Sequence, residues 1–372
     1  MSSSNEVTAV AVTGASSPLG HKVVAAIVRD PRVERVVVLD RPGSELAGLV
    51  SAVVLERPVT VEPHAVDLAD PGLGRALEGV TAIVHLGVSR LSGPDICGTG
   101  CAPDVPGTAS LLDLAVTLGV DSTVVLSSAL VYGAWPNNPI PLTEEAVLRP
   151  PAEVPEAVAF AEIERLVSEW RSAHPEAAVA ILRPTVTVDP ERRRWFSRSV
   201  WSGRGISIEG AEAPAQYLHI DDLVSAVVLA RSARLEGPFN VAPDGWLAAE
   251  QVRELSGPVR RLPVPAELVS GLARLRSLLP GAAVPSGLLS YTVHPWVIAN
   301  DRLRAAGWRP TLTNAEVFVD GDNQYPLFAL NARRRQMLSF AALGAATGLM
   351  VGGVVRYLGR RGAVRHRASA SR

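Results

Sequence analysis

Thr13-Gly14-Ala15-Ser16-Ser17-Pro18-Leu19-Gly20 joins an apolar, β-branched run, Val7–Thr13, to a helical segment. Gly14 permits a tight turn after the strand, and Gly20 lets the helix pack closely on the sheet. The first helical turn then offers unpaired N–H groups and the positive end of a helix dipole to a pyrophosphate. Ser17 stands at the middle position of a Gly-x-x-Gly-x-x-Gly spacing. The stretch predicts a phosphate-binding junction formed by Gly14, Ser17, Leu19 and Gly20.

Short apolar strands alternate with helical segments as far as Arg183. The expected strands are Val7–Thr13, Val33–Asp40, Val59–Asp67, Thr81–Leu86, Ser122–Ser127 and Val179–Arg183. The expected helices are Leu19–Arg29, Pro106–Leu118 and Pro155–Ser172. Near-continuous apolar strands that alternate with helices are typical of a parallel sheet covered on both faces. The sequence therefore predicts an α/β fold with a doubly wound, Rossmann-like sheet.

The pattern loosens after Asp189, where proline, tryptophan and arginine become frequent. The short helices expected there are Asp221–Arg231, Ala248–Leu255, Ala266–Leu278 and Asn300–Ala306. This composition favours a smaller lobe that covers the C-terminal edge of the sheet. We expect a dinucleotide-binding domain over 1–188, a substrate lobe over 189–330 and a basic-flanked tail over 331–372.

The tail contains an apolar run from Leu338 to Val355 with arginines on both sides. At about 1.5 Å per residue an 18-residue helix spans roughly 27 Å, close to the thickness of a hydrocarbon core. Gly344, Gly348 and Gly352 share one face, as in paired transmembrane helices. We expect a single-pass anchor over about 337–356 that tethers a cytoplasmic body to the cell membrane. The alternative is a buried terminal helix at a homodimer interface.

Asp40 ends the second expected strand, twenty residues after Gly20. An acid at this position accepts hydrogen bonds from the ribose hydroxyls of an adenine dinucleotide and repels a 2′-phosphate. NAD is therefore the expected cofactor, while the adjacent Arg41 leaves NADP as the alternative.

Composition excludes several other classes of function. The net charge of −1 gives no electrostatic footprint for nucleic acid. Cys97 and Cys101 are the only cysteines, with no histidine beside them, so we expect two reduced thiols and no metal site. The first residues lack the basic and apolar regions of a signal peptide. Lys22 is the only lysine in the chain.

Further stretches resemble one family. They are Val66-Asp67-Leu68, Ile83-Val84-His85-Leu86-Gly87, Leu126-Ser127-Ser128-Ala129-Leu130-Val131-Tyr132-Gly133, Leu182-Arg183-Pro184 and Tyr217-Leu218-His219-Ile220-Asp221-Asp222. In this order they resemble the extended short-chain dehydrogenase/reductase family, of the NAD-dependent epimerase/dehydratase type, over roughly residues 7–320. The resemblance implies that the cofactor is also contacted by Asp67, Leu68, His85, Leu86, Gly87, Ser127 and Pro184.

The catalytic set of that family is Asn, Ser or Thr, Tyr and Lys, and only the serine matches, at Ser128. Asp104 takes the place of the asparagine. Glu156 stands where the tyrosine of the Tyr-x-x-x-Lys pair belongs, and Phe160 stands where its lysine belongs. The lysine normally holds the nicotinamide ribose and lowers the pKa of the tyrosine, which phenylalanine cannot do. Ser128 and Glu156 are therefore the candidate catalytic residues, although Glu156 also fits a solvated position near a helix start.

Two functions follow from the resemblance. The first is a membrane-tethered NAD-dependent oxidoreductase or epimerase, with a nucleotide sugar or a hydroxysteroid-like lipid as substrate and a non-standard proton carrier. The second is a catalytically inactive member of the family that binds a dinucleotide as a scaffold or sensor at the membrane.

Overall fold

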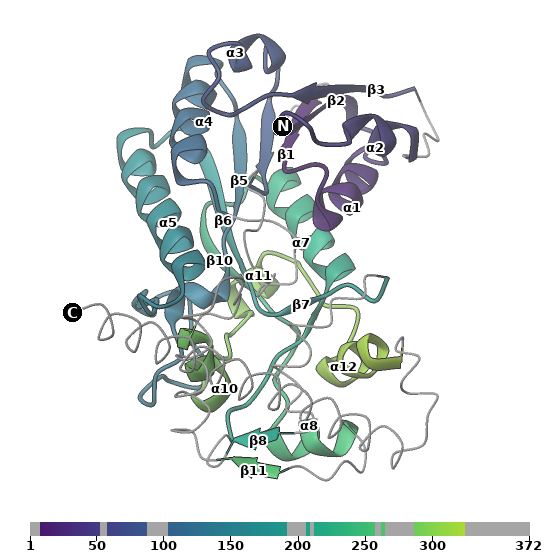
Figure 1. The fold of residues 1–372 in the computed structure, drawn as a ribbon. Helices are drawn as coiled ribbons and strands as arrows, with labels where there is room; N and C mark the ends of the chain where they lie inside the picture. Colours follow the sequence, from purple (N-terminus) through teal and green to yellow (C-terminus); the bar gives the residue numbers. More distant parts are fainter. Residues whose placement is uncertain are drawn as a thin grey trace, which may run out of the picture.

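The computed structural model describes residues 8–52, 58–87, 103–191, 206–208, 212–256, 262–264 and 286–323. Its centre is a seven-stranded parallel sheet with the order β10-β6-β5-β4-β1-β2-β3 (Figure 1). The strands are β1 (Thr8–Thr13), β2 (Val33–Asp40), β3 (Thr60–Ala65), β4 (Ala82–His85), β5 (Ser122–Leu126), β6 (Ala178–Pro184) and β10 (Gly237–Val241). The predicted doubly wound α/β sheet is confirmed. From β1 the strands are added first in one direction, to β2 and β3, and then in the other, to β4, β5, β6 and β10. Ligands of such sheets bind at the carboxyl ends of the two strands where this direction reverses, here β1 and β4.

The central strands are mostly apolar and buried because both faces of the sheet are covered. In β1, Val10 and Val12 contribute to one core cluster, whereas Ala11 contributes to another. This division follows from the alternation of side chains along a strand. β3 lies at an edge and contains only exposed and half-buried residues. It also contains Pro63, which an edge strand tolerates.

Helices cover the two faces of the sheet. α1 (Pro18–Ile27) and α7 (Ile220–Ser232) pack against each other on one face, and α4 (Val105–Thr117) and α5 (Pro155–Ala173) pack together on the other (Figure 1). Two shorter helices, α2 (Leu46–Ala52) and α3 (Leu73–Ala76), lie in the connections around β3. The first six predicted strands and the three predicted helices before residue 189 are confirmed, with ends within two residues of those expected.

Residues after 189 contribute to both parts of the molecule. α7 packs on the large sheet, and β10 extends that sheet by pairing with β6. The other elements after residue 189, together with the short strand just before it, lie at the carboxyl ends of the strands, below the sheet in Figure 1. They are β7 (Thr187–Val188), β8 (Ile206–Ile208), β9 (Leu218–His219), α8 (Ala249–Leu255), β11 (Leu262–Val264), η2 (Ser286–Leu289), α10 (Ser290–Val293), α11 (Asp301–Ala305) and α12 (Asn314–Asn323). The predicted helices α7, α8 and α11 are confirmed, whereas Ala266–Leu278 lies outside the described residues. The division at 188/189 stays a prediction.

The predicted anchor, about 337–356, lies outside the described residues, as do Cys97 and Cys101. Within the described ranges, no helix is both long and apolar enough to cross a bilayer. The same ranges contain no group of three or more His, Cys, Asp or Glu side chains placed to hold a metal ion.

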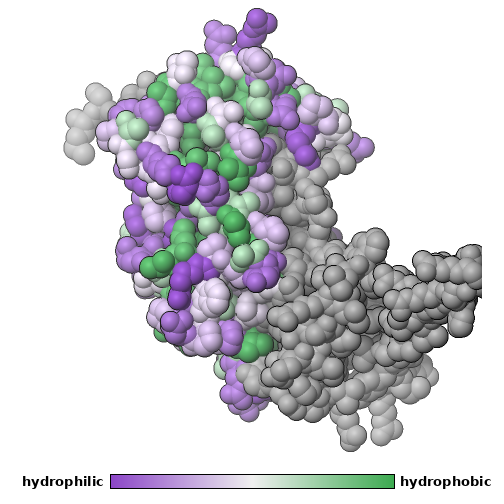
Figure 2. Space-filling view, turned by 60° about the vertical axis from the view of Figure 1, so that its left-hand side comes forward, coloured by the Kyte–Doolittle hydropathy of each residue, from purple (hydrophilic) through white to green (hydrophobic). Residues whose placement is uncertain are grey.

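The surface view in Figure 2 shows hydrophobic residues in small groups that hydrophilic residues separate. The most exposed large apolar side chain among the described residues is Val147, at 73%. Val116 of α4 and Val158 of α5 are also exposed. A homodimer stays a prediction.

Candidate functional site

The glycine-containing loop adopts the conformation expected of a phosphate-binding junction. Gly14 has φ +67°, and a Cβ atom there would lie 2.0 Å from the carbonyl oxygen of Gly87. A Cβ atom on Gly20 would lie 2.4 Å from the carbonyl oxygen of Gly14. Only glycine fits these two positions, so the loop brings together the end of β1, the end of β4 and the start of α1. Leu19, in the first turn of α1, is fully buried and anchors that turn in the core.

Ser17 is the N-cap residue of α1. Its backbone is extended, and its Oγ accepts a hydrogen bond from the backbone N–H of Gly20 at 2.9 Å. A serine side chain is a strong helix cap because it satisfies one of the N–H groups that the helix leaves unpaired. Pro18 follows at the first helical position, where its missing N–H costs nothing.

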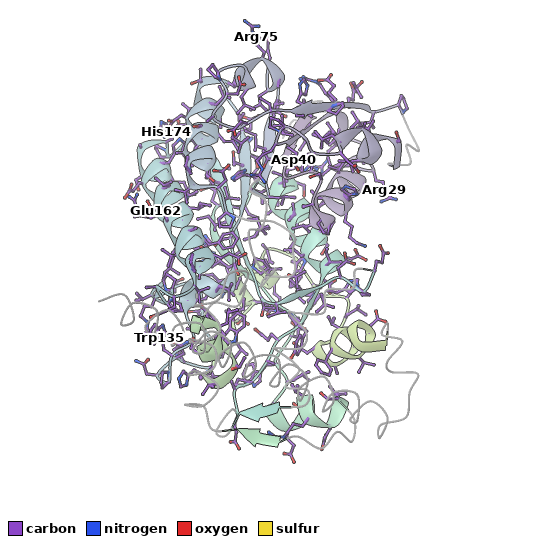
Figure 3. The ribbon with its side chains drawn as sticks, in the orientation of Figure 1. Arg29, Asp40, Arg75, Trp135, Glu162 and His174 are labelled. Carbon is purple, nitrogen blue, oxygen red and sulfur yellow. The ribbon has the colours of Figure 1, made fainter. Side chains whose placement is uncertain are left out.

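Asp40 lies at the carboxyl end of β2 and is 6% exposed (Figure 3). Its Oδ2 accepts from the backbone N–H of Ser16 at 2.9 Å and from Ser16 Oγ at 2.6 Å. Its Oδ1 accepts from the backbone N–H of Arg41 at 2.8 Å and from Ser44 Oγ at 3.0 Å. The carboxylate is thus directed at the glycine-containing loop, where the sequence places the ribose of a dinucleotide.

His85, the last residue of β4, is fully buried between two threonines. Thr108 Oγ1 donates to the carbonyl oxygen of Asp104 at 2.6 Å, so it accepts from His85 Nε2 at 2.8 Å. His85 Nδ1 then accepts from Thr13 Oγ1 at 2.7 Å. These bonds fix the neutral tautomer and join β1, β4 and α4. Both ring nitrogens are thus hydrogen-bonded to threonines. A contact between His85 and a cofactor stays a prediction.

Burial lowers the pKa of His85 to about 4 from its ordinary value of 6.5. The unfolded chain takes up a proton as pH falls below about 6.5, whereas the folded chain resists this until about pH 4. We therefore expect the free energy of unfolding to decline across that window, by about 3 kcal/mol at most. Urea unfolding at successive pH values checks this, with His85→Gln as the comparison. Equal slopes for the two proteins between pH 6.5 and 5 would contradict the assignment.

Asp67 and Leu68 follow β3. The backbone N–H of Val66 donates to the carbonyl oxygen of Asp40 at 2.8 Å, which fixes this segment next to β2. The Asp67 carboxylate is exposed and accepts from the backbone N–H of Ala69 at 2.9 Å. Leu68 is buried, and Leu86 is buried beside Gly87 after β4. The predicted contacts thus lie at the ends of β1, β2, β3 and β4.

Asp104 does not stand free at the asparagine position. It is the N-cap residue of α4, and its Oδ1 accepts from the backbone N–H of Gly107 at 3.1 Å. Its carbonyl oxygen accepts from Thr108. A cap role explains why an acid is found just before this helix.

A buried polar network lies beyond the end of β5. Ser127 Oγ donates to Glu164 Oε1 at 2.5 Å. Arg183 Nη2 lies 2.6 Å from Glu164 Oε2, and Arg183 Nε lies 3.0 Å from both carboxylate oxygens. Arg183 Nη1 donates to the hydroxyl of Tyr132 at 2.6 Å, and that hydroxyl donates to Asn240 Oδ1 at 2.7 Å. The network joins β5, α5, β6 and β10 and terminates beside Pro184, the last residue of β6.

The hydroxyl of Tyr132 is fully engaged in this network. Burial raises its pKa to about 12, against the opposing effect of the Arg183 guanidinium. Its hydroxyl accepts a hydrogen bond from Arg183 and donates one to Asn240 within the buried network.

Ser128 and Glu156 lie on neighbouring elements. Ser128 is buried and caps the short helix η1 (Ala129–Tyr132), where its Oγ accepts from the backbone N–H of Leu130 at 3.2 Å. Glu156 is half-buried in the first turn of α5, which packs on η1. Phe160 lies one turn later on α5 and is 3% exposed, in an apolar cluster with residues of η1. Phe160, which the resemblance aligns with the family's lysine, thus lies in an apolar environment.

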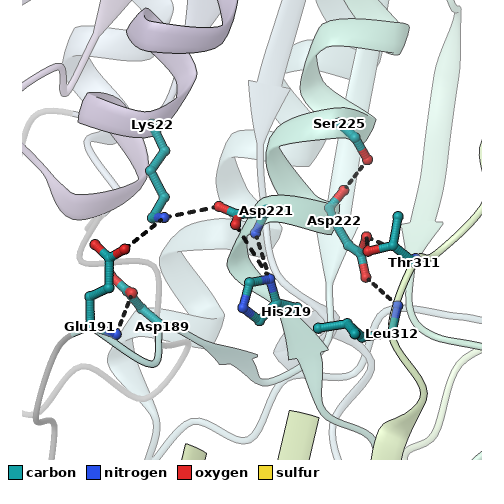
Figure 4. A network of polar contacts seen from close by, with 9 residues as sticks. All are labelled: Lys22, Asp189, Glu191, His219, Asp221, Asp222, Ser225, Thr311 and Leu312. Carbon is teal, nitrogen blue, oxygen red and sulfur yellow. Dashed lines mark hydrogen bonds and ion pairs between the residues drawn. The ribbon is translucent and has the colours of Figure 1, made fainter. Parts of the chain in front are cut away.

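Lys22, the one lysine of the chain, lies on α1 and not on α5 beside Glu156 and Ser128. Its Nζ lies 3.0 Å from Asp221 Oδ1 and 3.9 Å from Glu191 Oε1, so it joins α1 to the start of α7 and to the segment after β7 (Figure 4). The hydrogen bond and charge of Asp221 raise its pKa, although partial burial opposes this. Lys22 is an ion-pairing residue at the junction of two helices.

Several of these contacts were not predicted from the sequence. Ser16 and Ser44 bind Asp40, and Thr13 and Thr108 bind His85. The one indication in the sequence was the adjacent serines Ser16 and Ser17 between the two glycines. Two hydroxyls in a phosphate-binding loop can be expected to form hydrogen bonds with polar groups nearby.

Comparisons with known proteins find relatives in sequence and solved structures with a similar fold. An uncharacterized protein of Mycobacterium tuberculosis is 27% identical over 326 residues, which are 84% of this chain and 82% of that protein. The 3-diazoavenalumate denitrifying reductase of a Streptomyces species is 29% identical over 334 residues, which are 81% of this chain and 96% of that protein. The dTDP-glucose 4,6-dehydratase of Streptomyces venezuelae, solved with NAD bound, has a TM-score of 0.59 at 21% identity and covers 85% of this chain and 96% of its own.

The model of one family matches residues 10–242, from the middle of β1 to the end of β10. That range includes the glycine-containing loop, Asp40, His85 and the buried network around Arg183. The chain therefore belongs to the NAD dependent epimerase/dehydratase family.

Proposed function

We propose that this protein binds NAD and acts as an oxidoreductase or epimerase with a non-standard proton carrier. The observation that carries the proposal is the carboxylate of Asp40, held against the glycine-containing loop where the winding of the sheet reverses. An N-terminal helix end and an acid at the end of the second strand form the donor and acceptor set that an adenine dinucleotide requires. The family to which the chain belongs supports the same cofactor.

The residues at the ends of β1 and β2 and at the start of α1 fit an adenine dinucleotide. The backbone of Gly14, Gly20 and the start of α1 would hold the pyrophosphate, and Asp40 would hold the adenosine ribose. A carboxylate there repels a 2′-phosphate, so NAD is favoured over NADP, and Arg41 makes NADP the comparison to test. When bound, the nicotinamide supplies hydride exchange with a substrate.

The proton is the part of the chemistry that this chain must supply differently. Tyr132 is held in the buried network, and Phe160 replaces the lysine. Glu156 would hold or accept a proton at its carboxyl group, and Ser128 would orient the substrate oxygen, because these two side chains lie on the adjacent elements η1 and α5. The substrate class that we favour is a nucleotide sugar, as for the Streptomyces venezuelae dehydratase. A hydroxysteroid-like lipid is the alternative.

One observation favours a second function. The buried, apolar environment of Phe160 lacks the ammonium that holds the nicotinamide ribose in this family. A protein that binds the dinucleotide without turning over a substrate would tolerate this replacement.

Titration of the protein with NAD and NADP tests the proposal. We expect saturable NAD binding, and for Asp40→Ala we expect NAD binding weaker by about 10- to 100-fold, because hydrogen bonds to a charged group contribute about 1.5–3 kcal/mol. Asp70→Ala, a change at an exposed acid after β3, is the control. If neither dinucleotide binds at millimolar concentration, the proposal is wrong. Hydride exchange on a panel of UDP-sugars and 3β-hydroxysteroids then separates the two functions, and turnover that Glu156→Gln leaves unchanged excludes Glu156 as the proton carrier.

We also propose that the apolar run in residues 338–355 tethers the protein to a membrane. Its support is the sequence alone: 18 residues with two polar side chains, between arginines. Removal of residues 331–372 should move the protein from the sedimenting membrane fraction to the supernatant. Full-length protein that is already in the supernatant, or truncated protein that still sediments with membranes, would show that this segment is not an anchor.

A further inference from the structure

Two groups of the dinucleotide site are engaged by hydroxyls of the chain itself. At the start of α1, the backbone N–H of Gly20 donates to Ser17 Oγ at 2.9 Å. At the end of β2, the carboxylate of Asp40 accepts from the hydroxyls of Ser16 and Ser44. The first group is one that a pyrophosphate oxygen would use, and the second is the one that a ribose would use.

The arrangement at Asp40 reproduces the way in which a vicinal diol binds a carboxylate. Ser16 Oγ lies 2.6 Å from Oδ2, and Ser44 Oγ lies 3.0 Å from Oδ1. Each carboxylate oxygen therefore accepts a hydrogen bond from one serine hydroxyl. Each oxygen also accepts one backbone N–H, from Ser16 and from Arg41 respectively. An ionised carboxylate accepts about four hydrogen bonds. The hydrogen bonds from the two backbone N–H groups are fixed by the conformation of the loop. The hydrogen bonds from the two serine hydroxyls can break by rotation of the side chain alone.

We propose that Ser16, Ser17 and Ser44 form an internal cap of the dinucleotide site. Ser16 and Ser44 occupy the diol half of this site, and Ser17 occupies the phosphate half. The inference rests on the proposed binding of NAD. Binding exchanges these hydroxyls for groups of the ligand, so each serine reduces the net gain, and the two halves of the cap set the affinity independently.

The diol half is tested with Ser16→Ala/Ser44→Ala and two ligands: NAD and an NAD analogue that lacks both hydroxyls of the adenosine ribose. The variant should bind NAD about tenfold more tightly than the wild type, because the ligand no longer displaces a preformed hydrogen bond. Affinity for the analogue should not change, since the analogue has no diol to place on Asp40. A loss of NAD affinity would overturn the inference, because it would mean that the serines donate to the bound ligand.

The phosphate half is tested with Ser17→Gly, which releases the N–H of Gly20. Glycine is nearly as good a helix cap as serine, so the folded state should be retained. We expect affinity to rise about threefold to tenfold for both ligands, because both contain the pyrophosphate. An unchanged affinity for both would overturn the assignment of Ser17.

Ser51→Ala is the matched control, because Ser51 is an exposed serine on α2 whose hydroxyl donates to the carbonyl oxygen of Ala47. Thermal unfolding without ligand shows whether each variant folds. The ratio of the affinities for NAD and for the analogue reports the diol contact, because a purely structural effect would change both affinities and leave their ratio constant. If wild type and all variants fail to bind NAD, the proposed function is wrong and the cap with it. If the wild type binds and no variant differs from Ser51→Ala, only the cap is wrong.

Discussion

Glu164→Ala should lower the free energy of unfolding by about 3–5 kcal/mol. The Glu164 and Arg183 side chains are 2% and 6% exposed and form a bidentate ion pair at 2.6–3.0 Å. Removal of the carboxylate leaves the guanidinium buried with its charge uncompensated and takes the acceptor from Ser127. Because a domain is stable by only about 5–15 kcal/mol, a loss of this size removes much of the total.

Urea unfolding measures the effect. Glu162→Ala is the control on the same helix, because Glu162 pairs with Arg165 at the surface and such pairs contribute about 0–1 kcal/mol. Glu164→Leu combined with Arg183→Met should recover part of the loss, since it removes both charges. Similar losses for Glu164→Ala and Glu162→Ala would show that the buried pair does not stabilise the fold.

Gly14→Ala should be at least as damaging, with an expected loss of about 4 kcal/mol or more. Two effects combine. The residue needs φ +67°, which costs an L-residue about 1–2 kcal/mol. In addition, the new Cβ would lie 2.0 Å from the carbonyl oxygen of Gly87, so the loop or the end of β4 must move. The same movement should abolish NAD binding.

The chain offers a matched control for the first effect. Gly119 has the same φ, +67°, and a Cβ atom there would meet nothing within 4 Å. Gly119→Ala should therefore lose only about 1–2 kcal/mol. Denaturant unfolding of the two variants separates backbone conformation from crowding, and equal losses would mean that the contact between Gly14 and Gly87 does not constrain the loop.

The strands of the sheet were predictable where burial on both faces gives an apolar run, as in residues 36–39 of β2 and residues 124–126 of β5. β10 was not predicted. Its sequence, Gly-Pro-Phe-Asn-Val, contains three residues that disfavour strands (Gly, Pro and Asn), and its position at the edge of the sheet tolerates the proline. The pairing of β10 with β6 depends on chain segments about 60 residues apart, which no local pattern encodes.

The candidate site divides in the same way. The glycine-containing loop and Asp40 could be located because backbone conformation and strand ends have local sequence requirements. The partners of His85 and Glu164 could not, since they come from strands and helices that meet only in the folded chain. Asp104 had been assigned from the resemblance alone, and its role as a helix cap follows from its place just before α4.

The ion pair between Lys22 and Asp221 gives the molecule an unusual chemical handle. Since the chain has one lysine, an amine-directed reagent finds a single side-chain amine. That side chain joins the helix behind the glycine-containing loop to α7. The rate of its acylation therefore depends on how often the ion pair between Lys22 and Asp221 opens. A change in that rate on addition of a dinucleotide would report a change at the junction of α1 and α7 without any substrate having been identified.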